Sequence, residues 1–180
     1  MKKMVILIAA ILMIYSAMVK SEPYSIVFVE EGVEPEVGSC ELYPALYAEY
    51  LVRIWVHNDT VDGFISCRVD IDPGSDLITG MQYNPGLPVI TEGNFAFPEC
   101  QYDQWVWLCI YTIFYTGTPH YLTFIPDSNS GEMNITTCGT EEYPVKELLA
   151  GNEFGVNQPC VQDAGEDSWG AVKEIYRQKM

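Results

Sequence analysis

Three tryptophans in the middle of the chain have the type and spacing expected of a binding surface. Trp105 and Trp107 are two positions apart in an apolar run, and Trp55 lies in a segment of alternating apolar and polar residues. Residues two apart in a strand point to the same face of the sheet, so Trp105 and Trp107 share a face. Exposed indole rings would form a flat platform on which sugar rings stack, whereas buried rings would fill the core. The sequence leaves both interpretations open.

Six cysteines predict disulfide bonds. They are Cys40, Cys67, Cys100, Cys109, Cys138 and Cys160. An even number behind an export signal indicates up to three disulfides formed in an oxidising compartment. Many pairings are open, and the apolar segments around Cys67 and Cys109 favour a bond between these two. No CxxC motif is present, so neither a thioredoxin-like redox site nor a zinc knuckle is indicated.

Three closely spaced carboxylates form a candidate calcium site, which would be structural and is the only cofactor that the sequence suggests. Asp70, Asp72 and Asp76 supply the hard oxygen ligands that calcium prefers. Their spacing is not that of an EF-hand loop, and aspartates in turns also serve turn formation.

Catalytic patterns are weak. His57 and His120 are the only histidines, and no serine lies in a nucleophile-elbow motif. A pair of carboxylates suited to glycoside hydrolysis is always available among 25 acidic residues, so its presence carries no information. We therefore expect a non-catalytic protein, with a secreted glycosidase-like hydrolase that uses two acidic residues as the alternative.

The N-terminus resembles an export signal over residues 1–21. Lys2 and Lys3 precede an apolar run, and small residues lead to Ser21. The alternative, an uncleaved membrane anchor, is disfavoured because the apolar run is shorter than the roughly 20 residues that a spanning helix needs. We expect a secreted, extracellular or periplasmic monomer, associated with the cell surface or free, with no membrane insertion after cleavage.

The charge of the chain excludes some partners. The formal net charge is −16. Cleavage after Ser21 would remove three of the nine Lys and Arg and none of the 25 Asp and Glu, so that 6 − 25 leaves −19. Such a surface repels nucleic acid and anionic lipid. It suits a soluble exported protein or a partner with a basic patch.

The elements that position these residues are predicted to be strands. Trp105–Tyr115 is apolar or aromatic at nearly every position, which favours a central strand buried on both faces, followed by a turn and a return strand at Tyr121–Ile125. Tyr47–His57 alternates, with an apolar set that should face the core: Ala48, Tyr50, Val52, Ile54 and Val56. Asn58–Gly63 has the composition of a hairpin turn, so Phe64–Ile71 is expected to pair back on it. Short strands joined by Gly- and Pro-bearing turns predict an all-β sandwich or barrel in residues 40–160, behind an acidic lead-in at 22–39.

Past Cys160 the pattern changes. An acidic linker is followed, within residues 161–180, by a short predicted helix with Trp169, Val172 and Tyr176 on one face. This tail could be a recognition segment for surface sorting or partner docking, or a terminal helix that packs on its own sandwich.

Four stretches carry a resemblance to a known group. They are the opening at Cys40, ECQYDQWVW at Glu99–Trp107, NQPC at Asn157–Cys160 and DSWGAVKEIYR at Asp167–Arg177. The chain resembles uncharacterised secreted bacterial proteins that end in a similar Ser-Trp-Gly tail after a cohesin-like or carbohydrate-binding-like β-sandwich. The resemblance implies an antiparallel β-sandwich, cohesin-like or immunoglobulin-like, with a short C-terminal helix. It implies a binding or structural module whose partner is a protein or a glycan, and it assigns no catalytic residue.

Overall fold

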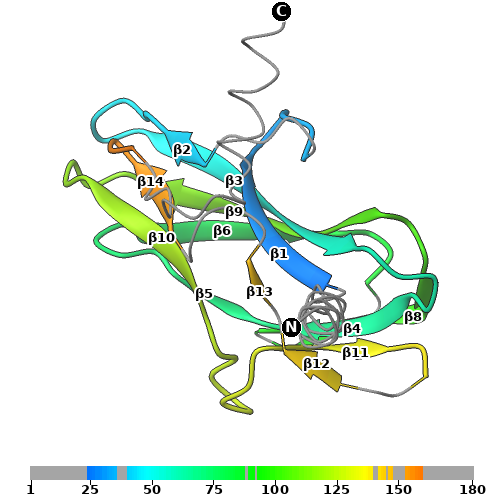
Figure 1. Ribbon diagram of the computed structural model, residues 1–180. Helices are drawn as coiled ribbons and strands as arrows, with labels where there is room; N and C mark the ends of the chain where they lie inside the picture. The colour runs from blue at the N-terminus through cyan, green and yellow to red at the C-terminus, as the bar shows by residue number, and fades with distance from the viewer. Residues whose placement is uncertain are drawn as a thin grey trace, which may run out of the picture.

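The protein is built from β-strands that form three sheets in two layers (Figure 1). The computed structural model describes residues 24–35, 40–87, 89–91, 93–139, 142–144, 146–147 and 153–159. No helix occurs in these ranges, and none that could cross a membrane is found there. The predicted all-β class is therefore confirmed. The predicted signal segment 1–21, the linker and the C-terminal helix lie outside the described residues.

One layer is a single five-stranded sheet. Its order is β13 (Lys146–Glu147), β1 (Tyr24–Glu30), β3 (Glu49–Asn58), β9 (Trp105–Phe114) and β6 (Leu77–Tyr83). The aromatic-rich stretch is thus an extended strand, as predicted, and pairs antiparallel with β3 on one side and β6 on the other. Its core-facing side chains are buried, whereas Trp105 and Trp107 on the other face are half-buried. The prediction of burial on both faces is therefore only partly correct.

The opposite layer consists of two smaller sheets. The first contains β2 (Glu41–Leu42), β14 (Phe154–Val156), β10 (His120–Ile125) and β5 (Asp70–Asp72), in that order. The second contains β12 (Glu142–Pro144), β11 (Asn134–Thr137), β4 (Phe64–Arg68), β8 (Asn94–Gln101) and β7 (Val89–Thr91). Only Val69 separates β4 from β5, so one run of chain passes from one small sheet to the other.

The predicted hairpin around Asn58–Gly63 is wrong. Strand β3 pairs with β1 and β9, whereas β4 pairs with β8 and β11 in the other layer. Likewise β9 and its predicted return strand β10 lie in different sheets. The physical reason is that each of these strands has an apolar face that must be buried against another layer, and a loop that crosses between layers achieves this for both.

The core lies between the layers and begins with the first described residue. Phe28 of β1 stacks on Phe124 of β10 with ring centroids 3.8 Å apart, and Tyr24 meets Phe64 of β4 at 6.2 Å. The four larger members of the predicted core set in β3 are all buried: Tyr50, Val52, Ile54 and Val56. Because β1 belongs to this core, the sandwich includes Tyr24–Glu30, which lie before the predicted boundary of Cys40.

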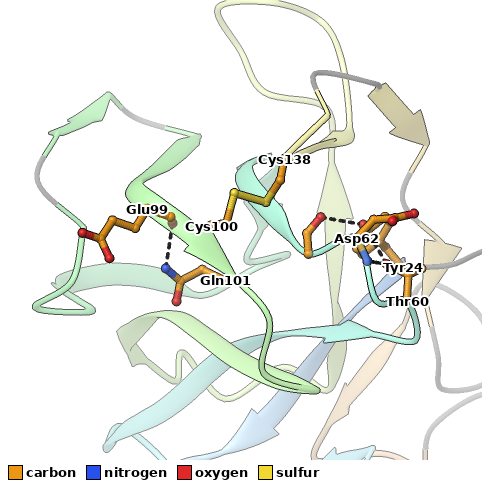
Figure 2. The surroundings of a disulfide bond; sticks show 8 residues. Tyr24, Thr60, Asp62, Glu99, Cys100, Gln101 and Cys138 are labelled. Carbon is orange, nitrogen blue, oxygen red and sulfur yellow. Dashed lines mark hydrogen bonds between the residues drawn. A yellow bond between two sulfur atoms is a disulfide. The ribbon is translucent and has the colours of Figure 1, made fainter.

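The cysteines divide into bonded and free. Cys100 at the end of β8 is bonded to Cys138 just after β11, with Cα atoms 5.8 Å apart (Figure 2). Cys40 is also disulfide-bonded, and Cys160 lies outside the described residues. The predicted bond between Cys67 and Cys109 is wrong, because both are free and buried. Burial is the main cause that raises the pKa of both thiols, and this disfavours the thiolate that disulfide chemistry requires.

Candidate functional site

The three candidate tryptophans meet on the outer face of the five-stranded sheet. Trp55 of β3 lies directly opposite Trp107 of β9, and the next aligned pair is His57 with Trp105. The intervening pair, Val56 and Val106, points into the core. Strand alternation therefore places all three indole rings on one side, on the face away from the second layer.

Arg53 completes this group. Its guanidinium carbon lies 5.0 Å from the ring centroid of Trp107 and 5.5 Å from that of Trp55. Glu31 holds the guanidinium in place through a 2.8 Å hydrogen bond from Arg53 Nε to its Oε2 and a second contact from Nη2 to Oε1. Arginine stacked on indole and paired with a carboxylate is a planar, well-oriented arrangement. We call Arg53, Trp55, Trp105 and Trp107 the Trp–Arg cluster.

The alternation of the sequence puts Arg53 on the same strand face as Trp55, but nothing along the chain assigns it a role. Its contact with Trp107 depends on the pairing of β3 with β9, which a single sequence does not reveal. The alternation of Tyr47–His57 was the available signal, since it already aligned Arg53 with Trp55.

One edge of the cluster is polar. The rings of His57 and Trp105 have centroids 4.4 Å apart, and His57 Nε2 lies 3.2 Å from Gln104 Nε2 and 3.4 Å from Asp59 Oδ1. The indole N–H groups of Trp55 and Trp105 are buried and have no hydrogen-bond acceptor. A buried donor without a partner costs roughly 1–3 kcal/mol, which is unusual on a face that serves stability alone.

The three calcium candidates do not converge. Asp70 Oδ1 accepts a hydrogen bond from the Ile71 backbone N–H at 2.8 Å, and Asp72 Oδ1 accepts one from the Gly74 N–H at 2.9 Å. Asp76 is directed elsewhere, into a buried group of its own. Across the described ranges, no three His, Cys, Asp or Glu side chains form a group that could hold a metal ion. Asp70 and Asp72 thus bond to their own strand end and turn, the other role considered for these aspartates.

Asp76 anchors a group that sequence reasoning missed. Its Oδ2 accepts the hydroxyl of Tyr50 at 3.0 Å, and its Oδ1 accepts the backbone N–H of Thr116 at 2.8 Å. Burial is the largest cause that raises the pKa of Tyr50, so this hydroxyl stays protonated and donates. The carboxylate thereby joins the turn before β6 to the loop after β9.

His120 lies beside Asp76 in an arrangement that resembles a catalytic triad without being one. Its Nε2 is 3.4 Å from Asp76 Oδ2, and its Nδ1 is 3.3 Å from Ser75 Oγ. However, Nδ1 is also 2.9 Å from the carbonyl oxygen of Thr118, a contact that requires a proton on Nδ1. A protonated Nδ1 cannot accept the proton of Ser75, so the histidine fastens two loops together and does not activate a nucleophile.

The second buried aspartate is also structural. Asp127 opens the turn before β11 and accepts hydrogen bonds from Ser130 Oγ at 2.8 Å and from the backbone N–H of Ser130 and Asn129. The side-chain bond from Ser130 is the first cause that lowers the pKa of Asp127. Asp76 and Asp127, the two buried carboxylates among the described residues, therefore each accept hydrogen bonds from loop residues.

Comparisons with known proteins give likeness in structure only. No family model and no curated protein sequence matches the chain. Among solved structures, the chain is similar to the sixth cohesin of scaffoldin B from Acetivibrio cellulolyticus, which was solved in complex with a Cel5 dockerin mutant. The two chains are 8% identical, and the alignment covers 74% of this chain and 97% of that one with a TM-score of 0.48.

Two further cohesins give similar values. The cohesin module of a Clostridium perfringens family 33 glycoside hydrolase is 7% identical, with 76% and 98% of the two chains covered and a TM-score of 0.49. The seventh ScaB type I cohesin of Pseudobacteroides cellulosolvens is 11% identical, with 79% and 96% covered and a TM-score of 0.46. All three TM-scores lie below 0.5, so the sandwich assignment rests on the strand pairing described above.

Proposed function

We propose that this protein is a non-catalytic binding module that docks a protein partner on the outer face of its five-stranded sheet. The observation that carries the proposal is the Trp–Arg cluster, in which one arginine lies over two tryptophans that are half-buried and outside the core. Tryptophan and arginine are the residue types most enriched among the anchors of protein interfaces. The unpaired indole donors of Trp55 and Trp105 add support, because functional faces tolerate such costs more readily than cores do.

A protein fits this face better than a glycan. Sugar recognition by aromatic side chains requires a free ring face. The guanidinium of Arg53 already lies over the rings of Trp55 and Trp107. The partly exposed tryptophans with the Arg53–Glu31 pair form a mixed aromatic and charged surface, which matches the anchor and polar rim of a protein contact.

The partner should carry basic residues, and the protein should work outside the cytoplasm. The net charge of −16 would attract a basic surface and repel nucleic acid. The signal-like residues 1–21 and the disulfide between Cys100 and Cys138 support an oxidising, extracellular or periplasmic location.

Affinity capture with matched variants tests the proposal. The immobilised full chain is incubated with surface and medium extracts of the producing cells, alongside Arg53→Ala, Trp107→Ala and the control Tyr102→Ala, whose ring is 64% exposed outside the cluster. We expect one protein that the wild type and the control retain and both cluster variants lose. Equal retention by all four chains would refute the proposal, as would binding to a glycan array that the cluster substitutions abolish.

A further inference from the structure

A second apolar surface lies at the opposite end of the same sheet. Five large hydrophobic side chains there are each at least 42% exposed, and we call them the loop-end patch: Tyr43, Leu46, Tyr47, Leu51 and Leu77. The Trp–Arg cluster lies at the start of β9, whereas Leu77 and Leu51 align with Phe114 and Thr112 at its end. Exposed apolar side chains gathered in this way mark a contact surface more often than scattered ones do.

Backbone contacts hold the loop of this patch against the end of β9. Ala48 accepts a hydrogen bond from the N–H of Tyr115 at 3.0 Å. The side chain of Leu46 lies so close over Gly117 that a Cβ there would come within 2.5 Å of its Cδ1. Gly117 has φ +104, a backbone conformation that favours glycine, and a side chain there would displace the tip of Leu46. The exposed side chains are therefore presented from a fixed loop.

The last described residues of the chain lie against the loop of this patch. The Asn157 N–H donates to the carbonyl of Leu42 at 2.8 Å, and its side-chain amide donates to the carbonyl of Pro44 at 3.0 Å. Asn157 is thus fastened to the loop that carries Tyr43 and Leu46. Pro159 is the last described residue, and 180 − 159 = 21 residues follow it.

The residues that follow have the chemistry to cover the patch. Segment 168–180 contains Lys173, Arg177 and Lys179 against one acid, Glu174, a local charge of 3 − 1 = +2 in a chain of net −16. Trp169, Val172 and Tyr176 fall three and four residues apart, the spacing of one helix face. Glu41 of β2 and Glu49 of β3 flank the loop 43–48 in the sequence and carry the opposite charge.

We propose that residues 168–180 of the same chain bind the loop-end patch, with Trp169, Val172 and Tyr176 on its apolar side chains. The eight residues 160–167 span at most about 29 Å when extended, which sets how far the segment can reach from Pro159. A tethered segment acts at an effective concentration near the millimolar range, so weak contacts suffice. A second copy of the sandwich is disfavoured because the two bodies are strongly acidic and repel each other. Leu51 of the patch lies two residues from Arg53 on the same face of β3, so the two proposed surfaces adjoin.

Site-specific photo-crosslinking of the full chain tests it. Benzoylphenylalanine replaces Trp169, the protein is irradiated, and the linked peptides are identified by mass spectrometry. We expect links within one chain to the peptides that carry residues 43–51 or 77. In the double variant Leu46→Ser, Tyr47→Asn the yield should fall about fivefold or more, since interface anchors dominate such contacts. Asparagine is chosen because Tyr47 has φ 57, which asparagine tolerates.

Val61→Ser is the matched control, because Val61 is 92% exposed in the turn between β3 and β4. Its yield should equal that of the wild type. Links to any other part of the sandwich, a cross-linked dimer, links to another protein, or the absence of links would each overturn the proposal. A yield that the double substitution leaves unchanged would also overturn it.

Discussion

The two faces of strands β3 and β9 differ in what their side chains do. Toward the core, Val52, Ile54 and Leu108 have 0% exposure and belong to the hydrophobic core of the sandwich. Toward the outside, Trp55 and Trp107 are half-buried under Arg53. The indole N–H groups of Trp55 and Trp105 on this face lack hydrogen-bond acceptors. One alternating backbone therefore carries a stabilising face and a face whose composition serves recognition. Substitutions on the two faces should separate stability from binding.

The largest effect on stability is expected from the core face. Phe28→Ala removes the ring stacked on Phe124 and should lower the free energy of unfolding by about 3–5 kcal/mol, measured by urea denaturation. Val61→Ala, at an exposed turn position, should change it by less than about 0.5 kcal/mol. A loss below about 1 kcal/mol for Phe28→Ala would mean that β1 is not part of the packed core.

The disulfide should contribute nearly as much to the free energy of unfolding as the ring of Phe28 does. It lies away from the proposed binding face. Replacing Cys100 and Cys138 by serine reopens a loop with a sequence separation of 38 and should lower the free energy of unfolding by about 3–4 kcal/mol. Partner capture at a temperature where the variant is folded should be unchanged, because the bond lies in the layer opposite the Trp–Arg cluster.

The wild-type protein, with all of its cysteines in place, tests the corrected pairing. When it is unfolded without reductant and alkylated, the peptides of Cys67 and Cys109 should carry the label and those of Cys100 and Cys138 should not. An unlabelled Cys67 peptide would restore the pairing expected from the sequence.

Arg53 tests the outer face. Arg53→Ala removes two cation–π contacts and a partly buried ion pair, so stability should fall by about 1 kcal/mol while partner capture is lost. Arg53→Lys keeps the charge but loses the planar stacking, and it should recover little of the capture. Full capture by Arg53→Ala would remove the distinction between the two faces.

The smallest expected effect is the pH dependence of stability that arises from Asp127. Hydrogen bonds, first of all the one from Ser130, hold the pKa of Asp127 below its ordinary value. A carboxyl whose pKa is depressed by folding stabilises the native state at any pH above its unfolded pKa, and this contribution fades as pH falls through the folded pKa. The stability difference between wild type and Asp127→Asn should therefore be present at pH 7 and shrink below about pH 4. A difference that grows on acidification would contradict this assignment.

The sequence revealed single strands well and their partners poorly. The alternation from Tyr47 to His57 predicted which side chains enter the core, because that pattern is local. It could not show that β3 and β4 belong to different layers, since a turn of the composition of Asn58–Gly63 serves a hairpin and a crossing equally well. The Cys67–Cys109 pairing failed for a related reason: two buried cysteines in apolar strands have the same local signature whether or not their sulfurs bond.

The site was predictable to the same extent. Trp105 and Trp107 could be placed on one face from their spacing, but their meeting with Trp55 and Arg53 depends on the register between β3 and β9. The group around Asp76 was missed because its members come from β3, two turns and β10, and no pattern along the chain connects them.

The affinity of the captured partner for Trp107→Ala tests the central claim most directly. Measured by isothermal titration on the folded full chain, it should be at least about tenfold weaker than for the wild type, because buried aromatic anchors dominate protein interfaces. Tyr102→Ala should bind as the wild type does. Equal affinity for the wild type and Trp107→Ala would show that the partner binds elsewhere and that the outer face of the sheet is not the docking surface.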